Sequence, residues 1–197
     1  MGSKVEDVIE YVQIKYDLTE LRSLFDQTIA SQPREYLECG AQSWTLGMGK
    51  HYQDLWKPLL QQHAKVHSHF CPLATGFNYS KTNSHNVPPH VDIDQMSYYN
   101  LLIPVAGVAR IDIFKTQQDE LEFRHGLTHW MMLREGVASQ KIGEFFLDKP
   151  TLLNTNHLHS VHPIYAPRSV WCTRWIGLPV DLSFREFKKK VEDTLNA

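Results

Sequence analysis

The stretch KIGEFFLDKPTLLNTNHLHSVHPIYAPRSVWCTRWI, at residues 141–176, indicates how this 197-residue chain folds. It contains three short segments rich in β-branched and aromatic residues, at residues 141–147, 151–154 and 169–176, separated by proline or asparagine. No segment between them is long enough for a crossover helix. Neighbouring strands are therefore expected to be antiparallel.

Three further segments of the same kind precede this stretch, at residues 74–80, 98–105 and 109–115. Six such strands in about a hundred residues are typical of an antiparallel sandwich or barrel. We therefore predict a β core over about residues 72–178. Residues 117–136 have no clear periodicity and are predicted to form an irregular excursion or a short helix.

Amphipathic patterns predict helices on both sides of the β core. They cover residues 17–31, 54–66 and 183–195. The last begins at a capping box formed by Ser183 and Glu186. We find no internal repeat and no long linker, so the predicted architecture is a mainly β, α+β single domain spanning residues 1–197.

Composition excludes several classes of protein. The formal net charge is −2, which counts against a protein whose main task is to bind nucleic acid. Three cysteines without a CxxC pair predict a reducing, cytoplasmic location. No signal-peptide pattern and no run of about 18 apolar residues is present, so no membrane partner is expected. The sequence makes no prediction about oligomeric state.

The segment PPHVD, residues 88–92, places His90 and Asp92 one residue apart. Residues with this spacing point to the same face of an extended chain, so both side chains can bind one ion. An imidazole and a carboxylate suit a non-haem Fe(II) ion, which needs a second histidine from a distant strand.

Two downstream histidines, His157 and His159, could supply that third ligand. They share one strand face because they are two residues apart. Nine residues after His159 comes Arg168, whose planar guanidinium can bind a carboxylate through two hydrogen bonds. His63 and His67 also have a spacing found in helical zinc sites, although no glutamate follows His63 as in those sites.

The pattern formed by His90, Asp92, His159 and Arg168 resembles that of the 2-oxoglutarate/Fe(II)-dependent oxygenase superfamily. The run HSVHPIYAPR, residues 159–168, is similar to the H-x-V-x-P-x-Y-A-x-R stretch of the hypoxia-factor prolyl hydroxylases. This similarity favours His159 as the third ligand. The resemblance covers about residues 74–178.

The resemblance implies a double-stranded β-helix, a jelly-roll or cupin-like core. It also implies that the three ligands hold Fe(II), that Arg168 binds 2-oxoglutarate as cosubstrate, and that O2 is consumed. A second polar contact to 2-oxoglutarate is predicted from Tyr79, Tyr98 or Asn100 on the flanking strands. Arg174 shares a strand face with Arg168 and is an alternative cosubstrate anchor.

The predicted activity is hydroxylation of an unactivated C–H bond, with release of succinate and CO2. The prolyl-hydroxylase-like run favours an amino-acid or peptidyl side chain as the substrate, either small or polymer-bound. An AlkB-like demethylase of nucleic acid is one alternative, disfavoured by the net charge. A cupin-type metal enzyme without 2-oxoglutarate is another, since His157 and His159 have the H-x-H spacing of cupins. A third is a binding module without turnover.

Overall fold

The computed structural model describes residues 8–13, 18–19, 22–23, 26–27, 43–46, 72–80, 86–92, 99–115, 118–123, 130–175, 178–179 and 181–197. Within this part, ten strands form one sheet. They are β1 (Ile9–Tyr11), β2 (Ser43–Leu46), β3 (Pro72–Ser80), β4 (Val87–Asp92), β5 (Tyr99–Phe114), β6 (Leu121–Phe123), β7 (Trp130–Leu133), β8 (Lys141–Leu147), β9 (Thr151–Asn154) and β10 (His159–Trp175). A 3-10 helix, η2 (Gln118–Glu120), precedes β6, and α4 (Phe184–Leu195) follows the sheet.

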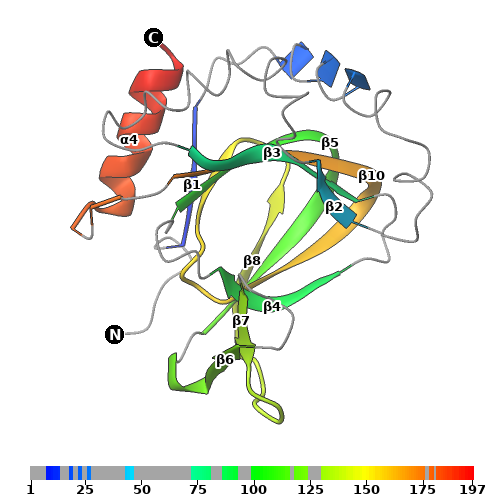
Figure 1. Cartoon of the computed structure of the whole chain (residues 1–197), viewed down its shortest axis with the longest axis vertical. Coiled ribbons are helices and arrows are strands. Elements are labelled where there is room, and N and C mark those ends of the chain that lie inside the picture. Colours follow the sequence, from blue (N-terminus) through cyan, green and yellow to red (C-terminus); the bar gives the residue numbers. More distant parts are fainter. Residues whose placement is uncertain are drawn as a thin grey trace.

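The antiparallel pair of β5 and β10 forms the centre of the molecule. Its register runs from His159 opposite Ile113 to Arg174 opposite Asn100. The two ends of this ladder have different neighbours. One end has β3 beside β10 and β9 beside β5, and the other has β4 beside β10 and β8 beside β5. Figure 1 shows the resulting sheet curled round on itself, with α4 along one side.

Both central strands bend where their neighbours change. Gly107 in β5 has a φ of 65°, a conformation that a residue with a side chain adopts only at a cost. In β10 the register shifts between Pro163 and Tyr165 and again before Ser169. Such irregularities bend a strand and increase its twist. They allow the same two strands to pass through both halves of the curled sheet.

Apolar side chains from both central strands and their neighbours fill the main core. Its buried members are Val8, Leu102, Ala109, Ile111, Ile113, Phe145, Leu147, Leu153, Val170 and Cys172. A smaller cluster joins Val91 of β4 to Phe114, Leu121 and Leu158. Burial of this kind is the main stabilising contribution in a domain of this size.

Helix α4 packs on the sheet through one face. Phe187, Val191 and Leu195 are buried, as their spacing requires. The ring of Phe187 contacts Trp175 edge-on, with centroids 5.1 Å apart, and lies 5.2 Å from the ring of Tyr99. The predicted capping box at the start of this helix is present.

Several predicted strands are observed, but the central ones are longer than predicted. The segments at 98–105 and 109–115 are one strand, β5, because pairing with β10 continues on both sides of the bend at Gly107. The segment predicted at 169–176 belongs to β10, which begins ten residues earlier at His159. Its prolines are accommodated because the ladder is irregular around them.

The prediction for residues 117–136 was incomplete. After η2 the chain forms the antiparallel pair β6 and β7, and β7 continues the sheet beside β4. Pairing with β4 supplies the hydrogen bonds that the local sequence does not indicate. Residues 18–19, 22–23 and 26–27 are helical, in agreement with the helix predicted at 17–31. The helix predicted at 54–66 lies outside the described residues, and none of the described helices is long and apolar enough to span a bilayer.

Candidate metal centre

Two histidines face each other where β4 pairs with β10. His90 and His159 are directly opposite in the antiparallel register, and their ring centroids are 4.4 Å apart. Opposite residues of paired strands lie on the same face of a sheet. Each histidine is only 3% exposed.

Asp92 lies two residues beyond His90 on the same face of β4. Its backbone N–H donates to the carbonyl of Thr155 at 3.1 Å, which ties the end of β4 to the segment before β10. One donor atom from each of His90, Asp92 and His159 lies within 4.8 Å of the others. The described residues thus contain a buried cluster of two imidazoles and one carboxylate that could hold a metal ion.

Backbone carbonyls orient both imidazoles. Nδ1 of His90 lies 2.8 Å from the carbonyl oxygen of Pro88, and Nδ1 of His159 lies 2.9 Å from that of His157. Because a carbonyl only accepts hydrogen bonds, each Nδ1 carries a proton, and Nε2 is the ring nitrogen that could bind a metal. This is the arrangement by which proteins prepare histidines for a metal.

His157 contributes its carbonyl to the orientation of His159, and its side chain is not part of the cluster. The structure therefore brings His159, rather than His157, beside the other two residues. Burial lowers the pKa of His159 to about 4, with a further contribution from the neighbouring His90. The imidazole of His159 is thus neutral at physiological pH, the state in which it can bind a metal.

Asp92 is ionised despite its burial. Burial alone would raise its pKa, but His90, Arg174 and His159 together hold the pKa well below its ordinary value. Asn100 Nδ2 donates to Asp92 Oδ2 at 3.1 Å, and Arg174 Nη2 lies 3.3 Å from the same oxygen. The other oxygen, Oδ1, lies 3.4 Å from His90 Nε2.

Arg168 is a buried cation in β10. It is 7% exposed, its Nε atom is buried without a hydrogen-bond partner, and it forms no ion pair with any described residue. Burial lowers its pKa to about 10, against a small opposing contribution from Cys172. A buried, unpaired guanidinium is costly unless an anion joins it.

The remaining predicted contacts have mixed outcomes. Asn100 contacts Asp92, a role that the sequence did not indicate. Tyr79 pairs with Ser169 through the backbone of β3, and its side chain is outside the described part of the structure. Tyr98, and the histidine pair His63 and His67, also lie outside the described residues.

The contact of Arg174 with Asp92 was not predicted from the sequence, which offered Arg174 only as an alternative anchor for the cosubstrate. The signal that could have identified it is its register, because Arg174 lies opposite Asn100 in the central ladder. Opposite positions share a face, so both side chains reach the carboxylate of Asp92. That register cannot be read from either strand alone.

A serine, a histidine and an aspartate also meet on the opposite face of the same strands, but they do not form a hydrolytic triad. His162 Nε2 lies 2.7 Å from Ser160 Oγ and 3.3 Å from Asp112 Oδ2. A triad requires the serine and the acid on different ring nitrogens. Ser160 is also fully buried. This cluster is therefore structural.

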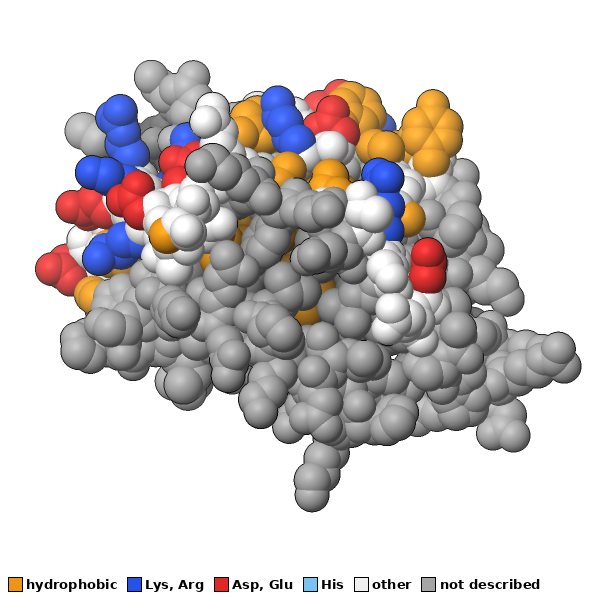
Figure 2. Space-filling model, turned by 90° about the horizontal axis from the view of Figure 1, so that it is seen from above, with side chains coloured by type: hydrophobic (Ala, Val, Ile, Leu, Met, Phe, Trp, Pro, Cys, Tyr) orange, Lys and Arg blue, Asp and Glu red, His pale blue; other side chains and the backbone are white. Residues whose placement is uncertain are grey.

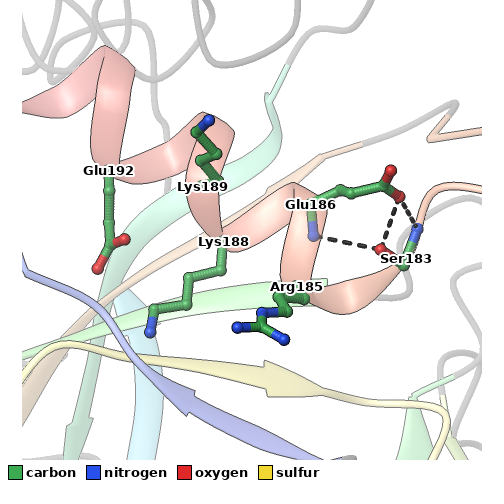
Figure 3. A pocket seen from close by; sticks show the side chains of 6 residues that line it. All are labelled: Ser183, Arg185, Glu186, Lys188, Lys189 and Glu192. Carbon is green, nitrogen blue, oxygen red and sulfur yellow. Dashed lines mark hydrogen bonds between the residues drawn. The ribbon is translucent and has the colours of Figure 1, made fainter.

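An open pocket along α4 is separate from the metal cluster (Figure 3). The residues that line it are Ser183, Arg185, Glu186, Lys188, Lys189 and Glu192. All belong to the helix or its cap. On the face shown in Figure 2, the described basic and acidic side chains are intermixed, as expected for a solvated surface.

The residues of the cluster fit divalent iron and an oxo-acid. Two histidines and one carboxylate are the facial donor set of non-haem Fe(II) sites. The buried Oδ1 of Asp92 makes no hydrogen bond, which leaves it available to a metal. Arg168 offers a positive charge that lacks an anion among the described residues. A dicarboxylate such as 2-oxoglutarate would satisfy it.

Comparisons with known proteins show similarity of fold. No protein-family model and no curated protein sequence matches the chain. The structure is similar to the epimerase SnoN in complex with Fe3+, alpha-ketoglutarate and nogalamycin RO, with a TM-score of 0.54, 10% identity, and coverage of 86% of this chain and 79% of that one. A second structure of SnoN, described as a non-haem alpha-ketoglutarate-dependent epimerase from nogalamycin biosynthesis, gives 0.51 and 11%, covering 90% and 84%.

AviO1 from Streptomyces viridochromogenes Tue57 matches with a TM-score of 0.50 and 12% identity, covering 90% of this chain and 93% of its own. At these identities the similarity concerns the fold alone. The chain therefore shares a mainly β fold with proteins that include a non-haem alpha-ketoglutarate-dependent epimerase. SnoN is described as an epimerase, so the resemblance to the prolyl-hydroxylase branch stays a prediction.

Proposed function

We propose that this chain is an Fe(II)- and 2-oxoglutarate-dependent oxygenase that hydroxylates an unactivated C–H bond. The observation that carries the proposal is the buried cluster of His90, Asp92 and His159, whose donor atoms lie within 4.8 Å of one another. The similarity to SnoN, whose structure holds Fe3+ and alpha-ketoglutarate, supports the choice of metal and cosubstrate. The buried Arg168, which has no anionic partner among the described residues, supports it independently.

We further infer that the curled sheet is a double-stranded β-helix. In that fold two four-stranded sheets face each other. One set here is β3, β10, β5 and β9, and the other is β4, β10, β5 and β8. Both sets share the long central strands, which bend between them. The candidate ligands lie on β4 and at the start of β10 in the second set.

In this proposal each residue has a defined task. His90, Asp92 and His159 would hold Fe(II), with coordination positions left for 2-oxoglutarate and O2. Arg168 binds the carboxylate of 2-oxoglutarate that is farther from the metal. When bound, iron and 2-oxoglutarate supply the oxidising chemistry: one O2 is consumed, one oxygen atom enters the substrate C–H bond as hydroxyl, and succinate and CO2 leave.

The substrate class is proposed from the sequence. The run HSVHPIYAPR at residues 159–168 favours an amino-acid or peptidyl side chain. A nucleic-acid substrate is disfavoured by the net charge of −2. A panel of free amino acids, peptides and methylated oligonucleotides therefore forms the first test. Nogalamycin RO belongs in that panel because the SnoN complex holds it.

The deciding experiment measures succinate formed from 2-oxoglutarate in the presence of Fe(II), O2 and each member of the panel. Succinate above the substrate-free background, together with a hydroxylated product, supports the proposal. His159→Ala should abolish both succinate release and metal binding. His157→Ala is the matched control and should retain both, since alanine keeps the backbone carbonyl that orients His159 and the His157 side chain is not part of the described metal cluster.

Failure of the parent protein to bind Fe(II) would contradict the proposal at once. Metal binding without saturable 2-oxoglutarate binding would instead favour a cupin-type metal enzyme that uses no oxo-acid. Loss of metal in His157→Ala but not in His159→Ala would overturn the ligand assignment.

A further inference from the structure

The two oxygens of the Asp92 carboxylate have different surroundings. Oδ2 accepts a hydrogen bond from Asn100 Nδ2 at 3.1 Å and lies 3.3 Å from Arg174 Nη2. Oδ1 is buried, makes no hydrogen bond, and lies on the side of His90, 3.4 Å from Nε2. The carboxylate is therefore held at Oδ2, and its other oxygen lies beside the imidazole of His90.

This asymmetry follows from strand pairing. Asn100 and Arg174 are directly opposite each other at one end of the β5 and β10 ladder, whereas His159 lies at the other end. Because the sheet is curled, both ends of the ladder reach Asp92. The backbone N–H of Asp92 is fixed separately by Thr155. Hydrogen bonds therefore hold both the backbone N–H and one carboxylate oxygen of Asp92.

The burial of Asn100 and the charge of Arg174 also suit these residues to holding the carboxylate of Asp92 in place. Asn100 is 3% exposed, and the side chain of Asp92 is 4% exposed, so their hydrogen bond is shielded from water. The Arg174 side chain is 22% exposed and supplies a permanent positive charge at the same oxygen. The Asn100 amide fixes the orientation of the carboxylate, and the Arg174 guanidinium compensates its negative charge.

We infer that Asn100 and Arg174 are positioning residues that restrict Asp92 to binding the metal through Oδ1 alone. The inference rests on the proposed function, because it concerns the geometry of the same metal centre. A carboxylate held in this way occupies one coordination position. Rotation of an unrestrained carboxylate would bring both oxygens to the metal and block a position that an oxo-acid or O2 needs.

The test uses Co(II) as the probe, bound to the full chain without cosubstrate. The variants are Arg174→Met and Asn100→Leu, which keep side-chain volume and remove the contacts to Oδ2. Each should weaken Co(II) binding by about 10- to 100-fold, the usual effect of removing a group that orients a metal ligand. Each should also change the visible absorption spectrum of bound Co(II), because the coordination of the carboxylate changes.

The matched control is Arg110→Met. Arg110 also forms an ion pair with an aspartate, Asp112, at 2.8 Å, but on the opposite face of the strands. Its removal should leave both the affinity and the spectrum as in the parent. Arg174→Lys keeps the charge and should recover part of the lost affinity.

Parental affinity and spectrum in both Asn100→Leu and Arg174→Met would overturn the inference while leaving the proposed function intact. If circular dichroism shows that Arg174→Met does not fold, the titration of Asn100→Leu decides, with the same two outcomes. A parent protein that binds neither Co(II) nor Fe(II) contradicts the proposed function instead. The two failures are therefore distinguishable.

Discussion

At the scale of single residues, the candidate site combines two kinds of neighbour: residues that share one face of a strand, and residues that lie opposite each other on paired strands. His90 and Asp92 could be placed together from the sequence because alternate residues of a strand share a face. His159 followed from its similarity to a known run, and the structure brings it opposite His90. The contacts of Asn100 and Arg174 with Asp92 could not be predicted, since they depend on a register between segments far apart in the sequence.

Arg168 carries a prediction about stability. Arg168→Met should raise the free energy of unfolding by about 1–2 kcal/mol, because it removes a buried cation that has no anionic partner among the described residues. The same variant should lose 2-oxoglutarate binding. Urea unfolding and calorimetric titration of the oxo-acid measure the two effects.

Arg110→Met provides the comparison for that stability effect. The guanidinium of Arg110 has a carboxylate partner in Asp112, so its removal should lower the free energy of unfolding. If Arg168→Met destabilises the protein as much as Arg110→Met does, Arg168 has a structural role and the prediction is wrong.

At the scale of elements, composition located most strands but not their lengths. Segments rich in β-branched and aromatic residues identified β8 and β9 with the observed bounds. The same signal predicted two strands in place of β5, because a glycine usually indicates the end of a strand. Gly107 bends the strand without ending it. The pairing of β6 and β7 was missed because its stabilisation comes from β4 rather than from local sequence.

The capping box of α4 allows a prediction for one element. Ser183 Oγ accepts a hydrogen bond from the backbone N–H of Glu186, and the Glu186 carboxylate accepts one from the Ser183 backbone. Ser183→Ala should lower the free energy of unfolding by about 1 kcal/mol. Ser183→Asp should retain most of the parental free energy of unfolding, since aspartate is also a good N-cap residue. Urea denaturation of the three proteins checks this, and an alanine variant as stable as the parent would contradict it.

An ion cluster joins β5, β8 and β10 and gives a pH dependence. Asp112 lies 2.8 Å from Arg110 Nε, 3.0 Å from Lys141 Nζ and 3.3 Å from His162 Nε2, and Glu144 pairs with the same lysine. Burial alone would raise the pKa of Asp112, but Lys141 and Arg110 outweigh it and hold the pKa below its ordinary value of 3.8. The ionised form is therefore favoured in the folded state.

Because the folded-state pKa of Asp112 is depressed, its stabilisation is present above the unfolded-state value of 3.8 and is lost as the pH falls through the lower folded-state value. Asp112→Asn should cost about 1 kcal/mol at pH 7, a modest value because its cationic partners are partly exposed. The difference from the parent should shrink below about pH 4. Unfolding curves from pH 7 to pH 3 measure this, and a difference independent of pH would exclude the ion pairs as its cause.

At the scale of the whole molecule, the antiparallel β class and the helix after the sheet were predictable, whereas the course of the central strands was not. The short segments rich in β formers indicated the class. Strands β5 and β10 each pair with two sets of neighbours because both strands bend. The sequence does not show this, since the bends matter only in the curled sheet.

Metal binding should stabilise the entire fold in the proposed enzyme. The candidate ligands come from β4 and β10, so unfolding would destroy the centre and release the ion. At a free metal concentration of 100 times Kd, the free energy of unfolding should rise by about 2.7 kcal/mol. Thermal unfolding with Co(II) or with a chelator measures this. His159→Ala should show no difference between the two conditions, and His157→Ala should show the parental difference.

The pairing of His90 with His159 also has a consequence for how the protein is made. The two residues are 69 positions apart in the sequence, and the ladder of β5 and β10 joins residues 46 to 74 positions apart. Contacts of such long sequence separation form slowly, because a large loop must close first. During synthesis on the ribosome, β4 emerges with His90 and Asp92 before His159 of β10 has been made. The complete donor set therefore does not exist in the nascent chain until β10 has emerged, and ion uptake in the proposed enzyme follows closure of the sheet.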